Sequence, residues 1–549
     1  MRHRLLAAIA LCVVSSGAAA PVAGRGPKFF PDDPLTQDPE TQDASGVRKW
    51  VINEAYDFIE NSFLDPGEHR DIRAQNVNTL DEVPDSSWFT NRLGTRVMTA
   101  EEVETGPIVG TGPAPGTWTI IEGKNEGITP GLTMVDSRGD LYYVKFDPPS
   151  NPEMATGAEV ISTQFFHALG YHVPENYIAV LHPADLRIDE AATIKDTNGK
   201  TRSFDKRDLA AVLQKAAVHD DGSYRVVASK GLPGKALGPF RYHGTRPDDP
   251  NDIYAHEHRR ELRGLRVFAA WLNHDDSRSI NTVDTLVERD GRQVVRHHLI
   301  DFASTLGSGS TAAQKPRAGN EYIWEARPTF VTMLTLGFYV RPWIKVKYPE
   351  FPAIGRFEAS YFTPERWKPE YPNTAFDNIR PDDAFWAARL MTAFDDDLIA
   401  GAVKSGQYSD PKAEAYLAQV LITRKHKTLQ YWLNGVLPLG EFELSPEGVL
   451  TFTNIAVDVK AAQPATEYRV RWFAFDNHTG TAAPVGDEAA SPGLTAHAPA
   501  ALLSEHPDLV MAELRGTHPQ HAGWATPLKV YFRRQPSNEW QLVGVERQP

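Results

Sequence analysis

Polar residues in the middle of the chain have types and spacing that suit phosphate transfer. His274, Asp276 and Asn281 form the pattern H-x-D-x-x-x-x-N. In that pattern the aspartate accepts or orients the proton of an attacking hydroxyl, and the asparagine binds Mg²⁺. Asp301 stands at the end of an expected strand, where a second ligand of the metal belongs. These residues predict a loop that moves phosphate onto a hydroxyl.

A lysine and a glutamate upstream could complete that site. Lys145 lies in the apolar, strand-like run 142–146, and Glu159 follows on an expected helix. A helix packed on the sheet could aim Glu159 at Lys145, and the pair would hold an ammonium group ready to meet phosphate oxygens. Taken alone, each residue is more typical of a solvated strand or helix face. Their order along the chain, ahead of the loop and the strand-end aspartate, favours a common site.

With these motifs the sequence resembles the atypical protein-kinase-like superfamily, especially HipA-type kinases, spore-coat CotH-type kinases and their secretory-pathway relatives, as an exported bacterial member. The similarity covers about 118–305 and, more loosely, the helices expected at 381–433. It implies a bilobal kinase-like fold that binds ATP or another nucleotide together with Mg²⁺ or Mn²⁺. By this resemblance Lys145 contacts the α and β phosphates and Glu159 pairs with it. Asp276 is then the catalytic aspartate, with Asn281 and Asp301 as metal ligands.

The resemblance also assigns a nucleotide-covering loop and a second cation. The segment 123–131, with Gly123, Lys124 and Gly127, lies where the loop over the phosphates belongs. It departs from G-x-G-x-x-G, so a plain turn between strands is an equally good interpretation. Arg278 stands where many kinases carry a lysine that meets the γ-phosphate, and its planar guanidinium can serve that role. Ala303 replaces the glycine that the family has after Asp-Phe.

Other functions fit the sequence less well. Histidines between residues 256 and 298 suggest a metal-dependent hydrolase, but the zinc-binding spacing H-E-x-x-H is absent. The stretch 307–310 lacks the G-x-S-x-G of a serine hydrolase. A catalytically silent kinase-like binding module is the second hypothesis, because export removes a protein from the compartment where ATP is plentiful.

The start of the chain has the layout of a secretory signal peptide. Arg2 and Arg4 precede an apolar stretch, and small residues at 18–20 supply a cleavage site. We therefore expect an exported protein that is periplasmic or extracellular. Cys12, the one cysteine, falls inside this segment, so the mature chain would have no thiol chemistry. No later segment approaches the roughly 20 apolar residues of a membrane-spanning helix.

Length and composition indicate several folded domains. A chain of 549 residues exceeds one ordinary domain, and 41% hydrophobic with 23% charged residues is typical of a folded protein. The net charge of −14 argues against nucleic-acid binding, which needs a basic surface. The expected partners are a nucleotide and a protein or glycan that accepts the phosphate.

We expect an α+β chain of six segments. These are a signal peptide (1–20), a disordered leader (21–45), an N-terminal helical extension (46–116), a kinase-like N-lobe (117–240), a helical C-lobe (241–440) and an all-β, sandwich-like domain (441–549). The extension depends on a helix over 47–63, with Trp50, Val51, Ala55 and Phe58 on one face. Strands are expected in 117–147 and after Pro438, and helices near 152–170, 256–274, 381–404 and 410–433.

Overall fold

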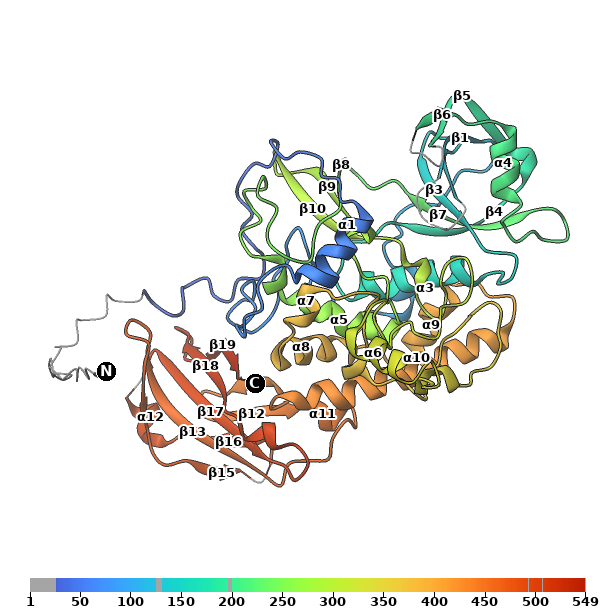
Figure 1. Cartoon of the computed structure of the whole chain (residues 1–549). Coiled ribbons are helices and arrows are strands. Elements are labelled where there is room, and N and C mark those ends of the chain that lie inside the picture. The colour runs from blue at the N-terminus through green and yellow to red at the C-terminus, as the bar shows by residue number, and fades with distance from the viewer. Residues whose placement is uncertain (1–25, 125–130, 196–199, 492, 506, 549) are drawn as a thin grey trace, which may run out of the picture.

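The computed structural model of the chain has a mixed α+β architecture, as expected (Figure 1). It describes residues 26–124, 131–195, 200–491, 493–505 and 507–548. The segment interpreted as a signal peptide, with Cys12, lies outside the described residues, and so does Gly127 of the expected phosphate-covering loop. Figure 1 shows a sheet with α4 at the upper right, a group of helices in the centre, and the C-terminal strands at the lower left.

The first sheet places Lys145 on the face opposite its own apolar core. In the described residues its strands run in the order β4-β7-β3-β2-β1-β5-β6. Their bounds are β1 Trp118–Gly123, β2 Gly131–Val135, β3 Leu141–Phe146, β4 Asn176–Leu181, β5 Leu186–Lys195, β6 Thr201–Ser203 and β7 Tyr224–Lys230. On β3, Tyr142, Val144 and Phe146 enter one apolar cluster. Because successive strand residues alternate between faces, Lys145 points to the other side. Helix α4 (Lys206–Leu213) packs against the apolar cluster of this sheet, whereas α3 (Met154–Ala168), which follows β3 along the chain, contributes its apolar residues to the cluster of the central helices.

A helical region and a small second sheet follow. The helices are α5 Arg260–Leu272, α6 Ala326–Leu334, α7 Thr374–Asp377, α8 Pro381–Met391, α9 Asp396–Lys404 and α10 Pro411–Trp432. Strands β8 (Lys235–Gly238), β9 (Thr282–Arg289) and β10 (Arg292–Leu299) pair in the order β10-β9-β8. The loop that carries Asp276 joins α5 to β9, and Asp301 comes just after β10. The hairpin of β9 and β10 therefore connects the segment that carries Asp276 to the segment that carries Asp301.

The C-terminal region is rich in strands, as the alternating pattern predicted, and begins at β11. Its strands are β11 Leu439–Leu444, β12 Val449–Asn454, β13 Glu467–Asp476, β14 Thr481–Pro484, β15 Ala489–Ser491, β16 Thr495–His497, β17 Leu509–Thr517, β18 Leu528–Arg534 and β19 Trp540–Arg547. They form one sheet in the order β11-β12-β16 and another in the order β14-β13-β17-β18-β19, with β15 paired to β13. Short helices α11 (Ile455–Asp458) and α12 (Ala500–Ser504) connect them. One apolar cluster runs from α5 and α8 into these strands.

The N-terminal segments differ from expectation. The helix predicted over 47–63 is confined to α1 (Glu54–Ile59) and a π-helical turn at Glu60–Leu64. Val51 is 86% exposed, whereas Asp57 is buried and accepts hydrogen bonds from Ser279 Oγ and Tyr371 Oη. A buried polar contact, rather than an apolar stripe, thus fixes this helix. Most of 64–116 is loop, as expected, with α2 at Ala100–Thr105, so the helix predicted for this extension is present but shorter than predicted.

The described part of the expected disordered leader, residues 26–45, packs against the rest of the chain. Phe29 is buried beside Phe475 and Tyr531 of the C-terminal strands. Ala44 donates its backbone N–H to the carbonyl oxygen of Gln293 on β10, at 2.8 Å. The polar composition of the leader therefore reflects its exposed side chains and not a lack of order in these residues. Within the described residues, no helix is long and apolar enough to cross a membrane.

Candidate functional site

Lys145 is buried between two carboxylates that come from separate elements. Its Nζ lies 2.8 Å from Glu159 Oε2 on α3 and 2.8 Å from Asp301 Oδ1 after β10. The Glu159 side chain is 1% exposed, and that of Asp301 is 32% exposed. Burial alone would lower the pKa of Lys145, but the charges of Asp301 and Glu159 outweigh it and raise the pKa. The structure thus brings together three of the residues that the sequence analysis selected, and the lysine stays cationic.

Asp301 is held by its backbone as well as by its charge. It has φ 62° and ψ 64°, a left-handed conformation that aspartate adopts more readily than most residues. The next residue, Phe302, donates its N–H to Glu159 Oε1 at 3.0 Å, so one glutamate ties α3 to the segment after β10. Burial works to raise the pKa of Asp301, but the ammonium groups of Lys145 and Lys124 bring it down to about 2. Asp301 is therefore an anion with a partly exposed carboxylate.

The loop between α5 and β9 carries Asp276 and is hydrogen-bonded to the segment that leads to Asp301. Asn281 Nδ2 donates to the backbone oxygen of Asp276 at 2.7 Å, and the Ile300 N–H donates to the backbone oxygen of Asn281 at 3.0 Å. These bonds fasten the loop to the residue that precedes Asp301. Burial raises the pKa of Asp276 to about 7; Arg278 opposes the rise, while Glu370 and Asp301 add to it. A carboxyl group with a pKa near neutrality can take up and release a proton at physiological pH.

Arg278 makes an ion pair with the side chain of Asp276. It also reaches Glu54 of α1 at 2.7 Å and Glu370 at 3.4 Å. Neither glutamate was selected from the sequence, because each lies far from the loop along the chain and has no motif around it. Asp275, in the loop itself, is a further carboxyl whose pKa burial raises, to about 8. Asp275 is the variable residue of the H-x-D pattern, so the pattern assigns it no role in phosphate transfer.

His274, the first residue of the H-x-D pattern, has a packing role. Its ring meets Phe166 and Phe302 edge-on, with centroid distances of 5.8 and 5.7 Å. Burial lowers the pKa of His274 to about 4, so the ring is neutral. Phe166 on α3 also stacks on Phe302 at 4.8 Å. These three rings pack α3, the loop and the segment after β10 against one another. This packing fixes the relative positions of the charged residues on these elements.

Two of the other histidines that suggested a hydrolase, His256 and His297, lie in buried pairs with aspartates. His256 Nε2 is 2.7 Å from Asp252 Oδ2, and His297 Nδ1 is 2.7 Å from Asp284 Oδ1. In the described ranges, no group of three or more His, Cys, Asp and Glu side chains is arranged to hold a metal ion. The amide oxygen of Asn281 and the carboxylate of Asp301 are nonetheless hard oxygen donors of the kind that Mg²⁺ prefers. This donor chemistry fits the metal that the sequence implies.

The segment expected to cover the phosphates is only partly described. At Gly123 an added Cβ would lie 2.7 Å from the Phe204 ring and 2.9 Å from Ile194 Cδ1. Tight packing therefore explains this glycine without any approach of a phosphate. Lys124 follows it, and its charge lowers the pKa of Asp301, so this lysine contributes positive potential at the site.

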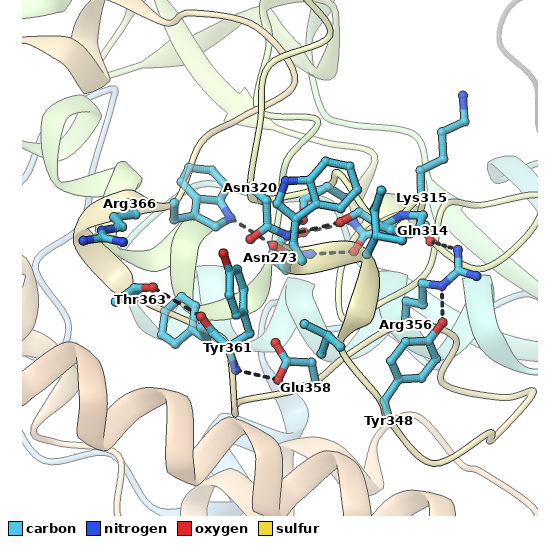
Figure 2. A pocket seen from close by; sticks show the side chains of 18 of the residues that line it. Asn273, Gln314, Lys315, Asn320, Tyr348, Arg356, Glu358, Tyr361, Thr363 and Arg366 are labelled. Atoms are coloured by element: carbon cyan, nitrogen blue, oxygen red, sulfur yellow. Dashed lines mark hydrogen bonds between the residues drawn. The ribbon is translucent and has the colours of Figure 1, made fainter. Parts of the chain in front are cut away.

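A cavity of about 200 Å³ lies beside the loop but not at Lys145 (Figure 2). Asn273 and Gln314 form part of its wall, and Gln314 Nε2 donates to Asp275 Oδ1 at 2.9 Å. Figure 2 shows Asn273 and Gln314 in the middle of the lining, with Tyr361 and Glu358 below them. Most of the lining comes from residues 314–367, which lack clear apolar periodicity, so the cavity could not be predicted from the sequence. Through Gln314 this cavity adjoins the residue next to Asp276.

Comparison with known proteins assigns no family. No protein-family model matches the chain, and no curated protein sequence matches it.

Proposed function

We propose that this chain is an exported, Mg²⁺- or Mn²⁺-dependent phosphotransferase with a bilobal kinase-like arrangement. It would move the terminal phosphoryl group of ATP or another nucleotide to a hydroxyl of a protein or glycan. The observation that carries this proposal is the contact of Lys145 with both Glu159 and Asp301. Lys145 is a buried cation held by Glu159 of a neighbouring helix, and it also contacts the partly exposed Asp301. This arrangement suits the binding of phosphate oxygens next to a metal. Export rests on the pattern of residues 1–20.

The proposal gives each residue one task. Lys145, fixed by Glu159, binds phosphate oxygens, and Lys124 adds positive potential. Asp276 takes the proton from the acceptor hydroxyl as the new O–P bond forms and the bond from phosphorus to the nucleoside diphosphate breaks. Asn281 and Asp301 would hold the metal, which neutralises phosphate charge when it is bound. Arg278 keeps the Asp276 carboxylate in place.

Nucleotide binding tests this proposal first. Binding of ATP with Mg²⁺ at a hundred times its dissociation constant should stabilise the fold by about 2.7 kcal/mol, seen as a rise in melting temperature. Asp301→Asn should reduce the metal-dependent part of that rise, because a neutral amide binds Mg²⁺ more weakly than a carboxylate. The matched control is Asp221→Asn, at an exposed aspartate in the turn before β7. No stabilisation by any nucleotide and metal would overturn the proposal.

Transfer is tested through Asp276. Asp276→Asn should abolish release of phosphate from the nucleotide to water, the simplest hydroxyl acceptor, while nucleotide binding is retained. Undiminished release would remove Asp276 from the proposed mechanism.

A catalytically silent kinase-like binding module is the second candidate. The ion pair between Arg278 and Asp276 favours it, because a carboxylate that is committed to a guanidinium is a weaker base. In that case nucleotide would still stabilise the wild-type chain, but neither the wild type nor Asp276→Asn would release phosphate.

A further inference from the structure

A large apolar surface lies on the segment that follows the candidate site along the chain. Between residues 323 and 344 ten large apolar side chains are exposed, and Leu336 and Phe338 reach 85% and 87%. Helix α6, in the middle of this segment, buries none of its residues. The ring of Trp324 meets that of Phe63 at 5.0 Å, which extends the surface to the exposed end of the N-terminal helix. A concentration of exposed large apolar side chains in one segment marks an interaction site.

The exposed charges within this segment are positive. Arg327, Lys345 and Lys347 are exposed. The acids of the same segment are half-buried and paired: Glu321 accepts from Arg341 at 2.5 Å, and Glu325 forms an ion pair with Lys368. The chain as a whole carries a net charge of −14, so the excess of exposed positive charge within 323–347 is a local departure from its average.

We propose that the surface formed by residues 323–347 docks on an anionic lipid bilayer. Exposed apolar side chains enter the boundary between headgroups and acyl chains, while flanking Lys and Arg meet the lipid phosphates. Trp324, Tyr339 and Trp343 are of the residue types that concentrate at this boundary.

Docking would bring the cavity beside the candidate site to the membrane surface. Trp343 and Ile344 line that cavity, and Ile344 is also 51% exposed on the docking surface. Asn273 and Gln314 line the same cavity, and Gln314 contacts Asp275 of the catalytic-type loop. The proposal itself depends on the exposed surface alone and holds whether or not the chain transfers phosphate.

Co-sedimentation with lipid vesicles, without nucleotide, tests the proposal. The chain should bind vesicles that contain phosphatidylglycerol at least tenfold more tightly than vesicles of phosphatidylcholine alone. Leu336→Ser with Phe338→Ser should weaken binding to the anionic vesicles at least tenfold. The matched control is Val97→Ser with Val109→Ser, at valines that are 86% and 90% exposed elsewhere, and it should bind like the wild type.

A second variant tests the contribution of the exposed basic residues. Arg327→Gln, Lys345→Gln and Lys347→Gln together should weaken binding to anionic vesicles about a hundredfold, at about 1 kcal/mol per basic residue. Binding to neutral vesicles should not change. All the substituted side chains are exposed, so unfolding temperatures should stay the same and show that the variants are folded.

Two results would overturn the proposal. One is the absence of binding to either kind of vesicle. The other is a dimer in light scattering that Leu336→Ser with Phe338→Ser converts to a monomer, because the surface would then be covered by a second copy of the chain.

Discussion

At the scale of single residues, the candidate site is a group of charges that depend on one another. Lys145 neutralises Glu159, which is almost fully buried, and also contacts Asp301. A buried carboxylate without a partner is strongly unfavourable, so the lysine is needed for the fold whether or not a ligand binds. Asp301 is less buried and keeps one carboxylate oxygen beyond its contact with Lys145. Because Asp301 is more exposed than Glu159, Asp301 is the carboxylate that a ligand can reach.

Substitutions of Lys145 and of Glu159 should lower the free energy of unfolding by unequal amounts. Lys145→Met leaves the buried Glu159 carboxylate unpaired and should lower the free energy of unfolding by about 3–5 kcal/mol. Glu159→Gln should cost less, because Lys145 keeps Asp301 and the amide oxygen can still accept from the Phe302 N–H. Urea unfolding of both variants measures the difference. Equal losses would contradict the view that an unpaired buried charge dominates.

The pKa of Asp276 predicts how activity depends on pH. A carboxyl group acts as a base only when deprotonated, and burial raises the pKa of Asp276 to about 7. The rate of phosphate release should therefore rise with pH up to about 7 and level off above it. Arg278 lowers this pKa, so Arg278→Gln should move the rising limb to higher pH.

The control for this profile is Arg202→Gln, which removes an exposed ion pair with Asp208 in the first sheet region. It should leave the rising limb in place. A limb that stays at the same pH in Arg278→Gln would mean that another group titrates.

At the scale of elements, α3 depends on one residue at its start. Asp147 Oδ1 accepts from the backbone N–H groups of Ala155 and Thr156 at 2.8 and 2.9 Å, and Oδ2 accepts from Thr156 Oγ1 at 2.7 Å. The side chain thus satisfies N–H groups that the first turn of a helix leaves without partners. Glu159 follows about one turn later, so Asp147 fixes the position from which Glu159 reaches Lys145.

Substitution of Asp147 tests this dependence. Asp147→Ala should lower the free energy of unfolding by about 1–2 kcal/mol, as for other helix caps, and should also weaken nucleotide binding. Asp147→Asn keeps an oxygen acceptor for the two N–H groups and should lose less of both. Chemical unfolding and calorimetric titration of the two variants provide the comparison. If both variants behave alike, the cap does not position Glu159.

Elements with strong periodicity could be predicted from the sequence, and those fixed by distant contacts could not. The hairpin strands of the first sheet and helices α3, α5, α8 and α10 follow their apolar patterns closely. Strand β5, with the sequence LRIDEAATIK, was missed, because its few apolar residues give no clear alternation and its parallel pairing with β1 is not local. The helix predicted at 47–63 was too long, because its buried residue is Asp57.

The same distinction between local pattern and distant contact applies to the residues of the candidate site. Lys145, Glu159 and Asp301 could be selected because each lies at a defined place on a predictable element. Glu370 and Glu54, the other partners of Arg278, come from segments whose approach to the loop depends on the whole fold.

At the scale of the whole molecule, the N-terminal segment holds two regions together. Phe29 and Lys28 lie on the C-terminal strands, where Lys28 Nζ is 2.5 Å from Glu546 Oε1. Further along the same segment, Glu40 pairs with Arg289 of β9, at 2.7 Å. One apolar cluster also continues from the central helices into the C-terminal strands, whereas the first sheet has a cluster of its own. The helices and the C-terminal strands should therefore unfold together, and the first sheet separately.

Phe29→Ala tests this division. Loss of a buried phenylalanine costs about 3–5 kcal/mol, which should lower the melting temperature of the shared transition by about 5 °C or more. The transition of the first sheet should not move. Phe30→Ala, at a phenylalanine that is 53% exposed, is the matched control and should change neither. Scanning calorimetry separates the transitions, and ATP with Mg²⁺ should raise both, because the proposed site takes Lys145 from the first sheet and Asp276 and Asp301 from the helical region. A single transition that Phe29→Ala and nucleotide both move would mean that the two apolar clusters unfold as one unit.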